Sequence, residues 1–272
     1  MKEYSNCPVC QKSSFSPFLS CTDYTVSKKV FDISQCDNCG FTFTNPIPLE
    51  TEIGSYYESE EYISHSNTSK GLINRLYQIV RNYTLKKKVN LLKSLSNGRA
   101  LLDIGSGTGE FLNQAKISGF QVQGIEPSEI ARKQAQENYE LEVGEESLLK
   151  TMDKESFDFI SMWHVLEHVY HLNERIKEIN RILKPKGHLI VAVPNRESYD
   201  SKYYGKYWAA YDLPRHLYHF TPSTISQLFD NQGFELQKVL PVKFDSYYVS
   251  LLSEKYKNGK SKLFSAFLLG LK

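Results

Sequence analysis

The sequence contains no long apolar run and no marked excess of charge of either sign. Its 272 residues carry a formal net charge of +2, so charge gives no general reason to expect a nucleic acid or a membrane as partner. The longest apolar runs, LIVAVP at 189–194 and LFSAFLLGL near the end, are shorter than the ~20 residues that span a bilayer. The start, MKEYSNCPVC, lacks the apolar segment of a secretory signal. We therefore expect a cytoplasmic globular protein.

Cysteine is also scarce, and four of the five cysteines fall into two C-x-x-C pairs: Cys7, Cys10, Cys36 and Cys39. Each pair brings two thiolates into one tight turn, and two such turns complete a tetrahedral zinc site. Disulfides are not expected in a reducing compartment. Unligated thiols and a redox C-x-x-C are the alternatives, but the paired spacing favours a structural Zn²⁺ ribbon over residues 1–45. Cys21 is expected to be a free thiol.

From residue 99 onward the sequence alternates between two kinds of pattern, without repeats or low-complexity tracts. Apolar runs predict strands at 99–105, 120–127, 139–143, 157–163, 188–195 and 234–244. Helical periodicity with capping and breaking residues predicts helices at 109–119, 128–138, 172–187 and 221–234. Strands separated by helices are typical of an α/β fold with a doubly wound parallel sheet. We expect this domain to span residues 99–246.

Two further segments flank this domain. Residues 46–98 are interpreted as a linker and a helical cap, with one helix over 70–96. No acidic residue lies between Tyr62 and Leu102, which indicates a solvated basic helix face, with an anion-binding surface as the alternative. Residues 247–272 are expected to form a helical tail, and no convincing final antiparallel strand follows 234–244. The apolar end of the tail could contact a partner or, less expectedly, a membrane surface.

A glycine-rich turn joins the first strand of the domain to its first helix, in the segment Asp103-Ile-Gly105-Ser106-Gly107-Thr-Gly109. At this place in a doubly wound sheet ligands bind outside the carboxyl ends of the strands. The spacing is G-x-G-x-G rather than the G-x-G-x-x-G of dinucleotide folds. A ligand carboxylate could bind the helix N-terminus, and Asp103 or a backbone carbonyl could accept from its ammonium. Glu126 ends the second strand, where a carboxylate can accept from ribose hydroxyls.

At these residues the chain resembles class I S-adenosylmethionine-dependent methyltransferases. The resemblance lies in LLDIGSGTGEF, GIEP, FDFISMWHVLEHV and LKPKGHLIVAVPN, over about residues 95–245. It implies a Rossmann-like fold that binds S-adenosylmethionine. The methionyl end would contact Asp103, Gly105 and Gly107, in the loop that also holds Ser106 and Gly109. Glu126 would bind the ribose, Glu145 would lie near the adenine, and Trp163 and His164 would border the sulfonium.

Within that superfamily the chain is similar to zinc-ribbon-bearing bacterial enzymes that are often assigned to cell-surface or secondary-metabolite glycan modification. The similarity rests on the two cysteine pairs before the domain and on DLPRHLYHFTP at 212–222 after its fifth strand. It implies a small-molecule acceptor, a hydroxyl of a sugar, a nucleotide-sugar or a lipid-linked glycan. A zinc-ribbon RNA methyltransferase and a non-catalytic zinc-binding scaffold are the alternatives, and neutral overall charge disfavours RNA.

The stretch from His164 to His168 spells H-x-x-E-H, a pattern also found in zinc peptidases. It begins where an expected strand ends, however, and the sequence offers no evident third metal ligand. In the similar ubiquinone-pathway enzymes the position of His164 is commonly acidic, and metal involvement there is possible. Methyl transfer from a sulfonium needs no Lewis acid. We therefore expect these residues to border the cofactor without a metal, and keep a divalent ion as the alternative.

A hydroxyl acceptor needs a general base close to it. The candidates are His168, His216 and His219. The segment 195–221 is too long for a plain connecting loop and is rich in aromatic residues, so it is interpreted as a substrate cap inserted into the domain. Arg215 in this cap is expected to bind an anionic group of the acceptor.

Overall fold

The computed structural model describes residues 1–58 and 72–259. By packing, the chain divides into two compact units. Unit 1 combines the residues up to Thr68 with 167–172 and the residues from Pro194 onward, and unit 2 combines 69–166 with 173–193. The predicted domain boundaries at 45, 98 and 246 stay a prediction.

Unit 2 is built on a five-stranded sheet in which every neighbouring pair is parallel. The strand order is β6-β5-β4-β7-β8. The strands are β4 Ala100–Ile104, β5 Gln121–Ile125, β6 Val143–Gly144, β7 Phe157–Trp163 and β8 Leu183–Ala192. The predicted doubly wound α/β fold is thereby confirmed.

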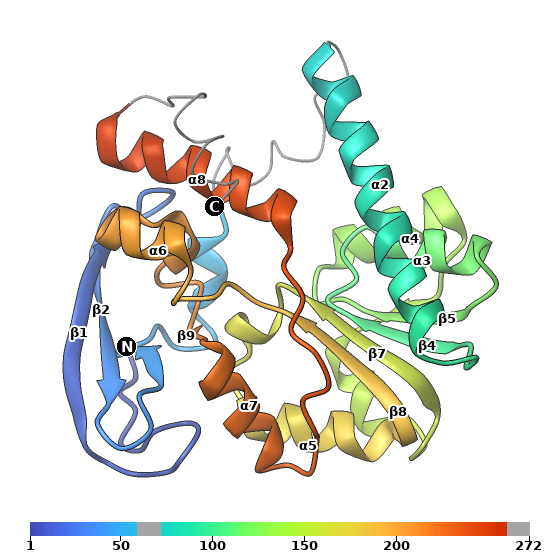
Figure 1. Cartoon of the computed structure of the whole chain (residues 1–272), viewed down its shortest axis with the longest axis horizontal. Coiled ribbons are helices and arrows are strands. Elements are labelled where there is room, and N and C mark those ends of the chain that lie inside the picture. Colours follow the sequence, from blue (N-terminus) through green and yellow to red (C-terminus); the bar gives the residue numbers. More distant parts are fainter. Residues whose placement is uncertain (59–71, 260–272) are drawn as a thin grey trace. The chain divides into compact units, whose positions relative to one another are not determined.

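Four helices surround this sheet: α2 Leu72–Leu95, α3 Glu110–Ile117, α4 Glu129–Tyr139 and α5 Leu172–Ile182. The chain steps outward from β4 to β6 in one direction and from β7 to β8 in the other. Because such crossovers are right-handed, α3 and α4 cover one face of the sheet and α5 covers the opposite face (Figure 1). Ser128 caps α4, since its side chain accepts a hydrogen bond from the Ala131 N–H.

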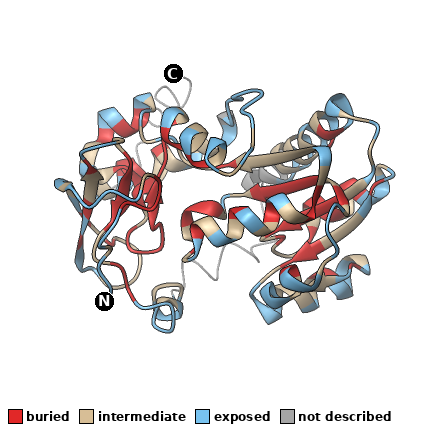
Figure 2. Cartoon of the chain, turned by 90° about the horizontal axis from the view of Figure 1, so that it is seen from below, coloured by how far each residue is buried: buried red, intermediate tan, exposed pale blue. Residues whose placement is uncertain are grey.

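The core of unit 2 lies between the sheet and the α2–α3 pair. Phe111 and Leu112 of α3 and Leu92 of α2 are buried together with Leu101 of β4 and Phe159 of β7. Figure 2 shows the central strands β4 and β7 of this sheet largely buried, whereas the helices expose their outer faces. This packing holds the carboxyl end of β4, and the glycine loop that follows it, in place.

Unit 1 contains an antiparallel sheet in the order β1-β2-β3-β9. Its strands are β1 Phe15–Thr22, β2 Val30–Cys36, β3 Thr42–Thr44 and β9 Tyr218–His219. β1 and β2 form an antiparallel hairpin between the cysteine pairs, and a segment far along the chain extends the sheet, with Phe43 opposite Tyr218. The remaining helices are α6 Tyr199–Tyr204, α7 Pro222–Asp230 and α8 Lys243–Asn258.

Two element predictions are wrong. The helix predicted over 172–187 ends at Ile182, and Pro185 and Gly187 lie within β8. The register between β7 and β8 shifts there, from Leu183 opposite Phe157 to His188 opposite Phe159. Pro185 lacks a backbone donor, and this irregular stretch of the ladder does not require one.

The strand predicted over 234–244 is absent: residues 234–242 have no regular structure, and α8 begins at Lys243. Leu236, Val239 and Leu240 are all exposed, so no sheet face buries the apolar pattern that suggested the strand. No antiparallel strand closes the unit 2 sheet within the described residues.

The apolar end of the tail lies outside the described residues. So does the first part of the acid-free stretch, residues 62–71, which precedes α2. Among the helices that the structure describes, none has the length and apolar character needed to cross a membrane.

Two substitutions on α3 separate core packing from helix propensity. Leu112 is fully buried, whereas Ile117 on the same helix is 73% exposed. We expect Leu112→Ala to lower the free energy of unfolding by about 2–5 kcal/mol, because it removes packed methyl groups and leaves a cavity. Ile117→Ala should change it by less than about 0.5 kcal/mol. Urea denaturation followed by circular dichroism measures both, and equal effects would contradict the described core.

Candidate functional site

The glycine loop between β4 and α3 adopts a conformation that other residues rarely take. Gly105, Gly107 and Gly109 have φ values of 74°, 55° and 86°. A Cβ atom on Gly105 would lie 2.3 Å from Val165 Cγ2, and one on Gly109 would lie 2.7 Å from Leu141 Cδ1. A Cβ atom on Gly107 would meet no atom within 4 Å. The loop is thus closely packed at both ends and open at Gly107, where a ligand can approach the backbone.

Glu126, directly after β5, lies against this open glycine. Its Oε2 atom accepts a hydrogen bond from the Gly107 N–H at 2.9 Å, and its Oε1 atom accepts one from the Ser128 N–H at 2.9 Å. Two backbone donors therefore fix the carboxylate beside the loop. The structure thus brings together Gly107 and Glu126, two residues that the sequence predicts to contact the same cofactor.

Asp103 is buried beneath the loop and not exposed on its surface. The Ser161 hydroxyl on β7 donates to its Oδ1 atom at 2.6 Å. Burial raises the pKa of Asp103 to about 7, while the Ser161 hydrogen bond and the positive charge of Lys88 act in the opposite direction. Neither Ser161 nor Lys88 was singled out from the sequence, because no motif marks them.

The other predicted cofactor residues lie at the ends of the neighbouring strands. Trp163 ends β7, and the Lys88 ammonium lies 3.9 Å from the centre of its ring. His164 is exposed, has a positive φ of 58°, and donates its backbone N–H to Ala192 O. Glu145 follows β6, is exposed, and accepts a hydrogen bond from the Ser147 hydroxyl.

Two polar side-chain atoms near the glycine loop and the end of β7 are buried without a hydrogen-bond partner among the described residues. Within residues 72–166, Ser106 Oγ and Trp163 Nε1 are both buried and neither has a hydrogen-bond partner. Unpaired buried polar atoms are costly, so they indicate a place where a further molecule supplies the missing hydrogen bonds. The open side of Gly107 and the acid at 126 lie where the sequence predicts the cofactor.

In unit 1, the four paired cysteines converge. Cys7 Sγ lies 3.6 Å from Cys39 Sγ, Cys10 Sγ lies 3.5 Å from Cys36 Sγ, and all four sulfur atoms lie within 4.8 Å of one another. Sulfur atoms at 2.3 Å from one tetrahedral zinc ion stand about 3.8 Å apart. The arrangement therefore has the dimensions of a four-thiolate site.

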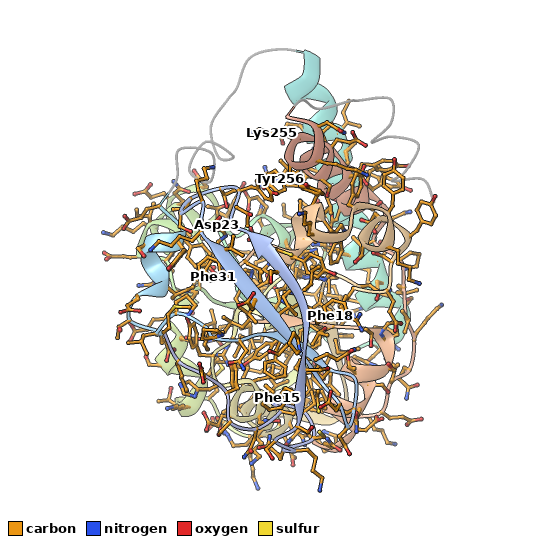
Figure 3. The ribbon with its side chains drawn as sticks, turned by 90° about the vertical axis from the view of Figure 1, so that its left-hand side faces the viewer. Phe15, Phe18, Asp23, Phe31, Lys255 and Tyr256 are labelled. Atoms are coloured by element: carbon orange, nitrogen blue, oxygen red, sulfur yellow. The ribbon has the colours of Figure 1, made fainter. Side chains whose placement is uncertain are left out.

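Arg215 is buried in unit 1, and its guanidinium is directed at protein acceptors. It donates to Asp23 at 3.0 Å, to both carboxylate oxygens of Asp212 at 2.7 and 3.0 Å, to the Tyr56 carbonyl, and to the Thr25 hydroxyl. Asp23 lies in the loop between β1 and β2 (Figure 3). Burial raises the pKa of Asp23, but the hydrogen bond from the Ser27 N–H and the charge of Arg215 outweigh it and hold this pKa well below its usual range. An anionic acceptor group at Arg215 stays a prediction, and it would have to displace one of these bonds.

Two of the three candidate histidines lie together. The rings of His168 and His216 meet edge to face, with centroids 4.6 Å apart. Burial and the nearby His216 lower the pKa of His168 to about 4. His219 is separately buried on β9, where its Nε2 atom lies 3.2 Å from the Thr44 hydroxyl. The structure thus groups His168 with His216 and leaves His219 in the sheet.

Comparison with known proteins identifies the family to which the chain belongs. A family described as a methyltransferase domain matches residues 77–239, more than half of the chain. The ubiquinone biosynthesis O-methyltransferase of Rickettsia bellii is 25% identical over 198 residues, which cover 67% of this chain and 82% of that protein. The protein of the same name from Pelagibacter ubique is 30% identical over 125 residues, 43% of this chain and half of its own length.

A solved structure extends the comparison to the fold. The magnesium protoporphyrin IX methyltransferase of Synechocystis PCC 6803, solved with bound S-adenosylhomocysteine, superposes with a TM-score of 0.54 at 16% identity. The match covers 70% of this chain and 91% of that chain. At this identity the similarity shows the fold alone.

The buried carboxyl of Asp103 gives the chain a pH-dependent stability. Because burial raises its pKa to about 7, the folded state disfavours the charged form, and the wild-type chain loses stability as pH rises from about 4 towards 7. Asp103→Asn cannot ionise. We therefore expect the difference in melting temperature, variant minus wild type, to increase from pH 5.5 to pH 8.

The matched control is Asp153→Asn, which alters an exposed carboxyl. Its melting temperature should differ from that of the wild type by the same amount at both pH values. A flat difference for Asp103→Asn, measured by scanning calorimetry, would show that this carboxyl does not carry the effect.

Proposed function

The chain belongs to the class I S-adenosylmethionine-dependent methyltransferases, and from this premise we propose that it methylates a hydroxyl oxygen of a small molecule. The observation that carries the donor half of this proposal is the Glu126 carboxylate, held by the Gly107 and Ser128 N–H groups beside the open glycine. The donor, when bound, supplies a methyl group on a positively charged sulfur.

We propose that unit 2 holds the donor through four features. Glu126 accepts from the ribose hydroxyls, and the loop at Gly105 and Gly107 receives the methionyl end at the N-terminus of α3. Ser106 Oγ and Trp163 Nε1 gain the hydrogen-bond partners that they lack within residues 72–166. Glu145 is exposed and follows β6, the strand that neighbours β5, at whose end Glu126 lies. This position supports a place for Glu145 at the adenine. Asp103 supports the loop from below, with Ser161 as its donor.

The acceptor requires a group that takes up the hydroxyl proton, and we propose the His168–His216 pair for this role. Support comes from the neutral state of His168, whose pKa is lowered to about 4, since only a neutral imidazole can act as a base. His219 is less suited, because it is fully enclosed in the sheet and already contacts Thr44.

Two acceptor classes have support of different kinds. The curated relatives are named ubiquinone biosynthesis O-methyltransferases, which favours oxygen as the acceptor atom and a quinone precursor as one class. The cysteine ribbon and the 212–222 segment favour a sugar, a nucleotide-sugar or a lipid-linked glycan, as the sequence analysis proposed. The two classes differ in polarity, so an unbiased assay distinguishes them.

We also propose that the four cysteines of unit 1 bind a structural Zn²⁺ ion. The sulfur separations of 3.5 and 3.6 Å support this, and four thiolates leave no position for substrate. An ion there would connect the N-terminal turn to the end of β2 in a sheet of only four short strands.

Donor binding tests the assignment of Glu126. Glu126→Ala removes a charged acceptor for ribose hydroxyls, and such hydrogen bonds contribute about 1.5–3 kcal/mol. We expect affinity for S-adenosylhomocysteine, measured by titration calorimetry, to fall roughly 10- to 100-fold. Glu137→Ala, which changes an exposed acid on α4, should bind like the wild type. Unchanged affinity in Glu126→Ala would remove this residue from the donor site.

Label transfer tests the reaction. The full chain is incubated with methyl-labelled S-adenosylmethionine and a fractionated cell extract, and the labelled fraction is identified. We expect label in a small molecule, as an ether that resists mild alkali. Label in RNA would contradict the proposal, and so would no transfer by a chain that binds the donor.

A further inference from the structure

Arg196, which follows the end of β8, differs from the other arginines in its surroundings. No carboxylate or carbonyl oxygen within residues 1–58 and 72–259 accepts from its guanidinium, and its Nε atom is buried without a hydrogen-bond partner there. The other arginines with described side chains each donate to such an oxygen: Arg81, Arg99, Arg132, Arg175, Arg181 and Arg215. A buried donor without an acceptor is costly, so an oxygen ligand would stabilise this guanidinium.

The Arg196 side chain is held in place without such a ligand. Asn195 Oδ1 accepts from the Glu197 N–H at 2.9 Å, which closes the turn that carries Arg196. The Arg196 N–H donates to the Phe220 carbonyl at 2.8 Å. The guanidinium carbon lies 4.8 Å from the centre of the Phe18 ring on β1, a cation–π contact (Phe18 is labelled in Figure 3). Because these contacts restrict the side chain, an ionic ligand would lose little free energy in ordering it.

The titratable groups that Arg196 affects do not neutralise it. Burial lowers the pKa of His219 well below its usual value, and the charges of His216 and Arg196 act in the same direction. Burial raises the pKa of Tyr211, and the Ser201 hydrogen bond and the charge of Arg196 oppose this rise. At neutral pH both side chains are therefore uncharged, and neither offsets the positive charge of Arg196.

Arg215, which the sequence suggests for an anionic group of the acceptor, has the opposite surroundings. Its guanidinium pairs with Asp23 at 3.0 Å and with Asp212 at 2.7 Å. A ligand anion there would add a third negative charge beside one cation, or leave a buried carboxylate without its partner, and both are costly. In the described part of the chain Arg196 pairs with no carboxylate, so an anion can bind it without displacing a protein group.

We propose that Arg196 binds an anionic group of the acceptor, a carboxylate or a phosphate, through the N–H groups of its guanidinium. This assignment rests on the proposed function, which places the acceptor hydroxyl at the His168–His216 pair. His219 lies within electrostatic range of both Arg196 and His216, so the guanidinium and the pair lie around one buried imidazole. An acceptor that reaches both has its hydroxyl at the pair and its negative group at Arg196. The acceptor is thus an anion at neutral pH.

Nitrogen-15 NMR of the full wild-type chain tests anion binding without donor or acceptor. Sodium phosphate or sodium benzoate is added at pH 7 and constant ionic strength, and the Arg196 Nε–H signal is identified by its loss in Arg196→Lys. We expect this signal to shift saturably, with phosphate, with benzoate or with both, which identifies the group that binds. The control within the same spectra is Arg99, an exposed arginine that donates to carbonyl oxygens. No saturable shift at Arg196 with either anion, or an equal shift at Arg99, overturns the proposal.

The methylated product gives a second readout. The labelled small molecule made by the wild type should be retained on an anion exchanger at pH 7, and an uncharged product overturns the proposal. With its unmethylated precursor as acceptor, Arg196→Lys should raise KM at least about tenfold and leave S-adenosylhomocysteine affinity unchanged, because lysine keeps the charge but not the paired N–H groups. Arg99→Lys should behave like the wild type. A chain that transfers no methyl group but shows the Arg196 shift contradicts only the proposed function.

Discussion

The contact of the Glu126 carboxylate with the Gly107 backbone is the constraint on which the proposed donor site depends. It joins the ends of β4 and β5, two neighbouring parallel strands, through one charged hydrogen bond of 2.9 Å. The glycine must expose its N–H, so the loop needs positive φ at three positions. Packing against Val165 and Leu141 allows no side chain at Gly105 or Gly109. Packing therefore requires glycine at 105 and 109, and the positive φ of 55° favours it at 107.

Unit 1 depends on a different interaction, the buried guanidinium of Arg215. Its bonds to Asp23, Tyr56 and Asp212 connect the β1–β2 loop to a segment some 190 residues later in the chain. Removing one partner of a buried ion pair typically costs about 3–5 kcal/mol. Because the carbonyl of Arg215 also holds His168, the structural network and the candidate acceptor residues are parts of one arrangement. The proposed role of the His168–His216 pair as a base depends on this network.

Local patterns predicted much of the fold and part of the site. Apolar runs and caps identified β4, β5, β7, α3 and α4, because each is stabilised by residues close in sequence, such as Ser128 with Ala131. The pairing of β9 with β3 and the burial of Arg215 depend on partners far along the chain, which no periodicity shows. For the same reason the sequence does not show that His216 lies against His168. The strand expected at 234–244 had a suitable pattern but no sheet face to cover it.

The central claim is that unit 2 binds a sulfonium nucleoside at Gly107 and Glu126. Titration calorimetry of the unaltered chain with S-adenosylhomocysteine tests it most directly. The account predicts saturable binding of one molecule per chain, which S-adenosylmethionine displaces competitively. A folded chain that gives no binding heat with either compound, over several temperatures, would contradict it.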